Sequence, residues 1–496
     1  MTNLRQCLVL SVWLIGAGSA CAQAADSPLP ATVTAALRQA GIPLNAISVL
    51  ISKADGSQAP RIQHLTERAM QPASLIKLVT SYAALDLLGP QFSWATPVWL
   101  DGAVNKGVLQ GNLVIQGQGD PSLVLERLWL LLHKVQGMGV RRIAGDIVVD
   151  RRAFALAPTD PAQFDGEPLR PYNAAPDALL INFRAIALTF TPDLAAGVAR
   201  VQMDPPLWGV RVPATVPLSG TPTGPCSDYR AALKADFSDP LQVRLAGSFA
   251  ASCGEKIWPV AYVAPDAYNA RALEGLWRSM GGQLQGRVRE GAAPNTAPSF
   301  TQNSPTLGAV IRDINKFSNN VMAQQLFLTL GRLPLDAGEP ALKPARQRVA
   351  LKAPTAALVP ATLERSRAQL RRWWLQRMGT PDVPVLDKGS GLSREARMSA
   401  QALGTLLQQA FASPYMPELM ASLPITGLDG TMQRSQATPA NAHLKTGSLR
   451  GVIARAGYVH TDRGETLCLV AIVNHERAQA ARPALDALVD WAAHSQ

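Results

Sequence analysis

Three short motifs along the chain carry side chains that can act together in acyl transfer. They are Ser74-Leu-Ile-Lys77, Ser318-Asn319-Asn320 and Lys445-Thr446-Gly447, in that order. The serine supplies a nucleophile, the first lysine supplies an amine that can take its proton, and the later motifs supply polar and cationic groups for a substrate. Each motif alone is a weak signal. Their order and their expected structural settings together indicate a serine acyl-transfer site.

The first motif pairs a nucleophile with a base on one face of a helix. The apolar pattern predicts a helix from Ser74 to about Leu88, ended by Gly89 and Pro90. Residues three apart share a helix face, so Lys77 lies beside Ser74. This helix is apolar on nearly every side, which predicts a buried helix. Burial favours the neutral amine, so we expect a lowered pKa for Lys77 and a role as the base. The alternative is a helix-capping serine beside a solvated lysine.

The second motif stands at the junction between two predicted helices, which end and begin near residues 317 and 320. The Ser318 hydroxyl can relay a proton towards a leaving amine, and the Asn320 amide can hold a substrate carbonyl. The alternative is that Ser318 or Asn319 caps the second helix, which is the commonest use of such residues.

The third motif is predicted to lie at the end of a strand. Lys445 and Thr446 can bind a terminal carboxylate, and Gly447 leaves room for a peptide to pair along the strand edge. The backbone N–H groups of Ser74 and Ser448 are the natural donors to an oxyanion. The alternative is an exposed strand lysine before a turn.

Hydrophobic periodicity divides the chain into two kinds of region. Residues 92–300 hold many short β-like runs between Pro and Gly residues, with one clear helix at about 124–136. We predict that 92–300 is a β-rich module of two nested subdomains inserted into a split domain, 25–91 and 301–496. In the split domain, helices are predicted at about 31–40, 74–88, 306–317, 320–330, 362–378, 398–411 and 478–493. Strands are predicted at 46–52, 451–459 and 465–473, and a further strand is predicted to end at 445–447.

Residues 1–24 have the pattern of an export signal. A basic residue precedes a short apolar run, and two A-x-A sites follow, with cleavage expected near 22–24. The chain of 496 residues has a net charge of +11, which suits an anionic partner such as cell wall or a membrane surface. No nucleic-acid-binding motif is present, so nucleic acid is not expected as a partner. The basic segment 333–360 is expected to be an exposed excursion, either solvated or bound to anionic wall polymer.

Cleavage of the signal would leave three cysteines. Cys226 and Cys253 can pair in an oxidising compartment, and the sequence leaves this pairing open. Cys468 falls in a strand that is expected to be buried, so we interpret it as a core residue. The six histidines are scattered and form no zinc or redox motif with the cysteines.

The chain resembles the class C low-molecular-mass penicillin-binding proteins, a family of D-Ala-D-Ala carboxypeptidases and endopeptidases. It carries the three motifs of the penicillin-recognising serine enzymes, and the wide interval from Ser74 to Ser318 leaves room for the module that this class inserts. The resemblance runs from about residue 30 to the end of the chain. Further matching stretches are Gly119-Asp120-Pro121-Ser122, Gly145-Asp146-Ile147, Gly389-Ser390-Gly391-Leu392-Ser393-Arg394 and 423–431.

The resemblance implies an α+β fold of the penicillin-binding, serine β-lactamase-like type, with an antiparallel sheet between helices, interrupted by the insert. It implies a periplasmic or cell-envelope peptidase for peptidoglycan stem peptides that is acylated by β-lactams and needs no metal or cofactor. Ser74 would be acylated, with Lys77 as base, and Ser318 and Lys445 would assist proton transfer. The resemblance places Asn320, Thr446, Gly447, Ser448, Asp150 and Arg394 in substrate binding, the last two in a pocket for the diamino acid of the stem.

Two other functions compete with this interpretation. A serine β-lactamase would share the nucleophile, but no deacylating base is recognisable and the large insert argues against it. A catalytically inactive wall-binding protein would not need Ser74 and Lys77, and both are present. The sequence leaves open the preference between carboxypeptidase and endopeptidase action, the diamino acid of the stem, contact with the membrane, and whether the chain forms a homodimer.

Overall fold

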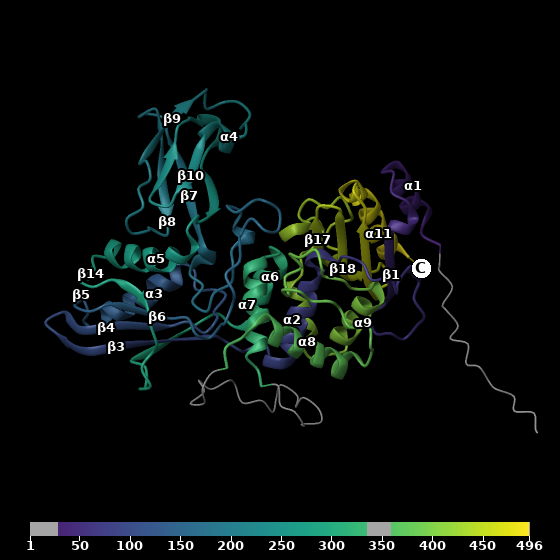
Figure 1. The fold of residues 1–496 in the computed structure, drawn as a ribbon. Coiled ribbons are helices and arrows are strands. Elements are labelled where there is room, and N and C mark those ends of the chain that lie inside the picture. Colours follow the sequence, from purple (N-terminus) through teal and green to yellow (C-terminus); the bar gives the residue numbers. More distant parts are fainter. Residues whose placement is uncertain (1–27, 335–358, 496) are drawn as a thin grey trace, which may run out of the picture.

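The computed structural model describes residues 28–334 and 359–495 (Figure 1). The predicted signal, 1–24, lies outside these residues, as does most of the basic segment 333–360. Within the described ranges, no helix is both long and apolar enough to cross a membrane.

A five-stranded antiparallel sheet lies at the centre of the split domain predicted at 25–91 and 301–496, which we call the catalytic half because all three motifs lie in it. Its order is β17-β18-β19-β1-β2, so the first strand of the chain lies between the last strand and a short edge strand. β18 and β19 are buried along nearly their whole length, because helices cover both faces. The strands are β1 (Ile47–Lys53), β2 (Ile62–His64), β17 (Ala442–Leu449), β18 (Val452–His460) and β19 (Thr466–Asn474).

Two hydrophobic cores flank this sheet. On one face, α1 and α11 pack against alternate strand residues such as Leu444 and Ile453. On the other face, a helical layer packs against the intervening residues, such as Ala454 and Tyr458. This arrangement confirms the predicted sheet between helices. The helices are α1 (Ala31–Gln39), α2 (Ile76–Leu88), α6 (Leu307–Lys316), α7 (Asn320–Gly331), α8 (Leu363–Met378), α9 (Ala400–Phe411), α10 (Met416–Ser422) and α11 (Arg482–His494).

The insert contains a mixed sheet of seven strands, and β3 and β16 lie at its junction with the catalytic half. Ala95 on β3 is opposite Asn303 on β16, so the two ends of the insert lie side by side. The order is β14-β5-β4-β3-β16, with β6 beside β4 and β15 beside β6. The strands are β3 (Ala95–Asn105), β4 (Val108–Gln116), β5 (Arg142–Ile143), β6 (Ile147–Asp150), β14 (Gln283–Leu284), β15 (Val288–Glu290) and β16 (Phe300–Asn303).

A second, outer part of the insert extends away from this sheet (Figure 1). It is a five-stranded sheet, β12-β9-β8-β7-β13, with a separate pair, β10-β11, and the short helix α4 (Tyr229–Leu233). The strands are β7 (Ala185–Asp193), β8 (Val198–Asp204), β9 (Thr215–Ser219), β10 (Ala235–Asp239), β11 (Gln242–Leu245), β12 (Phe249–Ala250) and β13 (Lys256–Ala261). Both sheets contribute side chains to one hydrophobic core.

The insert has two long helices where the sequence predicted one. The predicted helix is α3 (Leu125–Gly137), and the second is α5 (Pro265–Ser279). Pro265 occupies the first turn of α5, where a missing N–H costs nothing, so this proline starts the helix and is not a break between strands. The buried face of α5 carries Tyr268, Leu273 and Trp277, and this spacing is the signal that could have revealed it.

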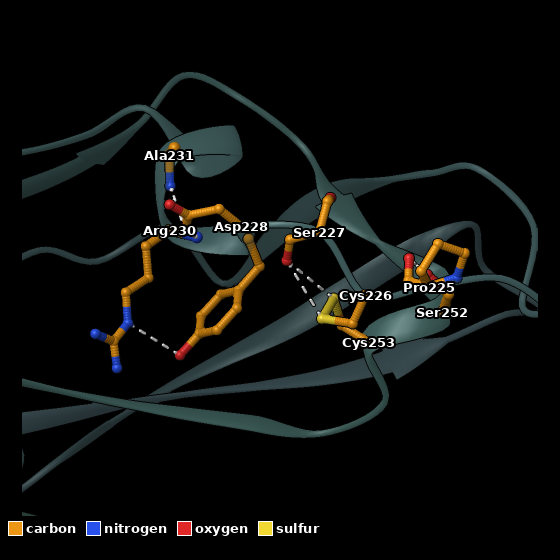
Figure 2. The surroundings of a disulfide bond; sticks show 9 residues. Pro225, Cys226, Ser227, Asp228, Arg230, Ala231, Ser252 and Cys253 are labelled. Atoms are coloured by element: carbon orange, nitrogen blue, oxygen red, sulfur yellow. Dashed lines mark hydrogen bonds between the residues drawn. A yellow bond between two sulfur atoms is a disulfide. The ribbon is translucent and has the colours of Figure 1, made fainter. Parts of the chain in front are cut away.

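The cysteine pairing that the sequence left open is made in the outer part of the insert. Cys226 and Cys253 form a disulfide beside the start of α4, where the Asp228 carboxylate accepts the N–H groups of Arg230 and Ala231 (Figure 2). Cys468 is buried on β19, as predicted.

Candidate active site

The first motif places a serine hydroxyl against a fully buried amine. Ser74 lies in a 3-10 turn, Ala73–Leu75, that leads into α2, and residues 76–87 of α2 are all buried. Lys77 Nζ lies 2.9 Å from Ser74 Oγ, 2.6 Å from Asn320 Oδ1 and 2.5 Å from the Ser390 carbonyl oxygen. The predicted helix is therefore present, with its first turn in 3-10 form.

The electrostatics at Lys77 favour the neutral amine. Burial, reinforced by the nearby charge of Lys445, lowers the pKa of Lys77 well below its usual value. A neutral amine can donate two N–H bonds, to Asn320 and to the Ser390 carbonyl, and accept the Ser74 hydroxyl on its lone pair. The three contacts thus orient Lys77 as a base for Ser74.

The turn before the nucleophile is held in a strained conformation. Ala73 has a φ of 49°, in the region that favours glycine. The Gln71 side chain accepts a hydrogen bond from the Ala73 N–H at 2.7 Å. The backbone of Gln71 is held by the side chain of Asn474 on β19, whose Oδ1 accepts the Gln71 N–H and whose Nδ2 donates to the Gln71 carbonyl oxygen. A Cβ on Gly391 would lie 2.0 Å from the Ala73 carbonyl oxygen, so only glycine allows this approach. Gln71 and Asn474 were not predicted as part of the site, because no local pattern connects them.

In the second motif, one residue caps a helix and the other two contact the buried lysines of the site. Asn319 caps α7 by accepting the Met322 N–H at 3.1 Å. The capping alternative therefore applies to Asn319, while Ser318 and Asn320 are brought to Lys445 and Lys77. Ser318 lies between α6 and α7 with a φ of 56°, and its Oγ accepts a hydrogen bond of 3.0 Å from Lys445 Nζ.

The third motif lies on β17, at the edge of the sheet. Lys445 is fully buried, and this burial lowers its pKa to about 7. Its Nζ also donates to the Thr446 carbonyl oxygen at 2.7 Å. Gly447 packs against the nucleophile turn, because a Cβ there would lie 2.7 Å from the Pro72 carbonyl oxygen. The alternative of an exposed strand lysine is wrong for Lys445.

The outer edge of β17 is open beside the nucleophile. Residues 424–426 pair with its first part, through bonds from Thr426 N to Ala442 O and from Leu444 N to Pro424 O. In an antiparallel ladder, alternate residues point their N–H and C=O groups to the same edge, so Thr446 and Ser448 also direct theirs outwards. An extended peptide can pair there, and the Ser448 N–H can serve an oxyanion.

A cavity of about 850 Å³ lies over this edge, between the catalytic half and the insert. Six residues of the predicted site line it: Ser74, Ser318, Asn320, Thr446, Ser448 and Arg394. Lys77 and Lys445 lie buried behind them. Additional lining residues that the sequence analysis missed include Phe164, Asp165, Tyr172, Phe183, Phe317 and Thr431.

The structure does not bring Asp150 to the cavity, because its carboxylate lies buried within the insert. It accepts hydrogen bonds from Gln116, from the Arg152 side chain and from the backbone N–H of Ala293, so it joins neighbouring segments of the insert and does not line the cavity. The carboxylate of the insert that does line the cavity is Asp165. No motif surrounds Asp165, so no sequence signal marked it.

Asp165 and Arg394 bring opposite charges to the same cavity. Tyr172 and Asn173 donate to the Asp165 carboxylate, each at 2.8 Å. Burial acts to raise the pKa of Asp165, but these hydrogen bonds outweigh it and the pKa is lowered. The Arg394 guanidinium stacks over the Phe164 ring at 4.8 Å and donates to the Arg450 carbonyl oxygen.

Comparison with known proteins identifies the family. The model of the D-Ala-D-Ala carboxypeptidase 3 (S13) family matches residues 29–348 and 359–495. The chain belongs to this family. It is thus a class C low-molecular-mass penicillin-binding protein, and the three motifs are those of a serine-type DD-peptidase. The resemblance noted in the sequence is confirmed.

Relatives match over most of their length. The chain is 25% identical over 412 residues to the D-alanyl-D-alanine carboxypeptidase DacB of Haemophilus influenzae, covering 82% of this chain and 80% of that one. It is 27% identical over 424 residues to a D-alanyl-D-alanine carboxypeptidase of Actinomadura sp. strain R39, covering 79% and 71%.

Solved structures share the fold. Penicillin binding protein 4 of Haemophilus influenzae matches with a TM-score of 0.66 at 22% identity, over 92% of this chain and 99% of that one. The predatory endopeptidase Bd0816 of Bdellovibrio bacteriovorus matches with a TM-score of 0.51 at 15% identity, over 90% and 92%. The predicted fold class is therefore confirmed.

Proposed function

We propose that this protein hydrolyses peptidoglycan stem peptides at the bond after the penultimate D-Ala, through an ester on Ser74. The observation that carries the proposal is one connected set of contacts. Lys77 joins Ser74 to Asn320, and Lys445 joins Ser318 to the strand edge where a peptide can pair.

The acylation step follows from these contacts. Neutral Lys77 takes the proton of Ser74 Oγ, and the oxygen attacks the carbonyl carbon of the penultimate D-Ala. The N–H groups of Ser74 and Ser448 stabilise the oxyanion. When the C–N bond breaks, the leaving amine takes the proton of the Ser318 hydroxyl, and Lys445, which donates a hydrogen bond to Ser318, replaces that proton. Lys445 is then neutral, while Lys77 carries the proton taken from Ser74.

Deacylation reverses the roles of the proton-carrying groups. Water gives a proton through Ser318 to the neutral Lys445 amine and attacks the ester, and Ser74 Oγ leaves with the proton that Lys77 carries. A β-lactam would be attacked in the same way, but its amine stays tethered after ring opening and hinders the approach of water. The Haemophilus influenzae enzyme has been solved in complex with a β-lactam.

The substrate-binding roles follow from the cavity. Asn320 Oδ1 accepts a hydrogen bond from Lys77, so the side-chain N–H groups of Asn320 are left for a substrate carbonyl. Thr446 lines the cavity where the terminal carboxylate of the substrate would bind. We further propose that Arg394 and Asp165 bind the side chain of the stem diamino acid. Such a side chain carries an amine and, in some stems, a carboxylate, which complement these two charges.

The proposed setting is the cell envelope. We propose that residues 1–24 direct export, that the mature chain is periplasmic, and that 92–300 forms a module within the split domain 25–91 and 301–496. The net charge of +11 supports peripheral contact with an anionic wall polymer or membrane surface. Homodimer formation is the remaining proposal on partners.

The test is the intact mass of the mature protein after brief exposure to benzylpenicillin, beside Ser74→Ala. A lasting adduct on the wild type alone supports the acyl-serine site. Consumption of the drug without an adduct would favour a β-lactamase. Unreacted drug with unmodified protein would favour an inactive wall-binding protein. Release of D-Ala from a linear stem peptide, compared with cleavage of a cross-linked dimer, then separates carboxypeptidase from endopeptidase action.

A further inference from the structure

The loop 424–431 links the second motif to the third. It follows α10, and its first residues pair with β17 just before Lys445. Its last residue, Thr431, lines the active-site cavity. The loop therefore runs from the covered part of the β17 edge to the open part.

A charged pair holds this loop against the second motif. Lys316 ends α6, two residues before Ser318, and its ammonium forms an ion pair with Asp429. The Lys316 side chain is 5% exposed and that of Asp429 is 36% exposed. The other Asp429 oxygen accepts the Ile425 N–H at 2.8 Å. One carboxylate thus connects the end of α6 to both ends of the loop.

The loop also passes very close to the backbone of α6. A Cβ on Gly430 would lie 2.5 Å from the Lys316 carbonyl oxygen, and the φ of Gly430 is 53°. Glycine is therefore required by both space and backbone conformation. Because Gly430 precedes Thr431 directly, this contact and the ion pair together determine where the Thr431 side chain lies.

The result is a pair of hydroxyl groups at the open edge of β17. Thr446 Oγ1 lies 2.7 Å from Thr431 Oγ1, and both residues line the cavity. Lys445 is fully buried behind them, and its Nζ donates to the Ser318 hydroxyl and the Thr446 carbonyl oxygen. Two neighbouring hydroxyl donors match the two oxygens of a carboxylate, and donors to a charged group form stronger hydrogen bonds than donors to a neutral one.

We propose that Thr431 is a specificity-determining residue that binds the terminal carboxylate of the substrate together with Thr446, and that Lys316 and Asp429 position it. In the free enzyme the two hydroxyls bond each other, and on binding both turn to the carboxylate. The inference rests on the proposed function and adds a residue outside the three motifs.

The first test compares two substrates that differ in charge at one end. An N-acylated peptide ending in D-Ala-D-Ala is compared with its C-terminal carboxamide. Thr431→Val should lower kcat/KM for the acid about tenfold or more, mainly through KM, because a hydrogen bond to a charged group is lost. The carboxamide should be hydrolysed as by the wild type, and Thr431→Ser should restore the preference for the acid.

The matched control is Thr438→Val. The Thr438 hydroxyl donates to Asp490 at 2.9 Å and does not line the cavity, so this variant should keep the wild-type ratio of acid to carboxamide. A loss at Thr431→Val that is equal for both substrates, or an unchanged ratio, overturns the role of Thr431.

The second test asks whether Asp429 acts through Thr431. Asp429→Asn should lower the ratio of acid to carboxamide, and adding it to Thr431→Val should lower that ratio no further. Independent, multiplying losses would overturn the positioning role. Glu465→Gln, which removes an ion pair with Lys53 at the far end of β19, is the control. Failure of the proposed function is recognised separately, because the wild type would then form no adduct with benzylpenicillin.

Discussion

The close approach of Gly447 to the nucleophile turn leads to a quantitative prediction for Gly447→Ala. The added Cβ would lie 2.7 Å from the Pro72 carbonyl oxygen, 3.2 Å from the Ala73 Cβ and 3.3 Å from the Ala454 Cβ. The first contact is with backbone, which no side-chain rotation can relieve. β17 and the turn before Ser74 must therefore move apart by roughly 0.5 Å to reach an ordinary contact, given the steep repulsion of overlapping atoms.

This displacement separates the two proposed oxyanion donors from each other. One donor, the N–H of Ser74, follows the turn, and the other, the N–H of Ser448, follows β17. A misplacement of about 1 Å costs on the order of a hundredfold in rate, so we expect acylation to slow by about tenfold. The measurement is the second-order rate constant of acylation by benzylpenicillin, followed by intact mass over a time course.

Gly137→Ala is the control for this experiment. No atom lies within 4 Å of a Cβ added at Gly137, near the end of α3, so its acylation should match that of the wild type. Thermal melting of both variants shows whether they are folded. Acylation of a folded Gly447→Ala variant within twofold of the wild-type rate would refute the reasoning.

Three further predictions concern pH, the nucleophile turn and the insert. Burial lowers the pKa of Lys445 to about 7. Between pH 7 and the ordinary lysine pKa the unfolded chain therefore binds more protons than the folded chain, so the free energy of unfolding should rise with pH in that window. Denaturation midpoints of Lys445→Met, measured against pH, should lack this part of the rise, and curves parallel to those of the wild type would contradict the prediction. Asn474→Ala removes both hydrogen bonds to the backbone of Gln71 and should slow acylation by benzylpenicillin about tenfold. An unchanged rate would show that the turn before Ser74 keeps its conformation without these bonds. Replacing Cys226 and Cys253 by serine should destabilise the outer part of the insert by about 3.5 kcal/mol, as the separation of 27 residues between the two cysteines predicts, with acylation unchanged. Slower acylation would mean that the outer part supports the site.

The catalytic half was largely predictable because its signals are local. The buried helix after Ser74 and the strand pair 451–459 and 465–473 have strong apolar patterns, and the structure contains α2, β18 and β19 at those places. The pairing of Lys77 with Ser74 follows from helix geometry alone. The buried state of Lys445 did not follow from its own sequence neighbours, because distant segments surround it: its Nζ donates to Ser318, 127 positions away in the chain.

The parts that could not be predicted depend on distant segments meeting. Asp165 reaches the cavity only because the insert lies against the catalytic half, while Asp150, in a more suggestive sequence, lies buried in a sheet. Thr431 is placed by an ion pair between residues 113 positions apart in the chain. No local pattern encodes such contacts, so the sequence pointed to Asp150 and matched the stretch 423–431 without showing that Asp165 and Thr431 reach the cavity.

The position of β1 in the central sheet has a consequence for when the enzyme can become active. β1 lies between β19 and β2, and Ile47 pairs with Val473. A growing chain that ends before β18 and β19 leaves β1 with β2 as its one described neighbour in the sheet, and leaves Lys445 without the strand that aligns it. The nucleophile is made early and the Lys445 strand late, so an incomplete chain carries the serine motif without the contacts that activate it. Latency during synthesis is thus a property of the strand order.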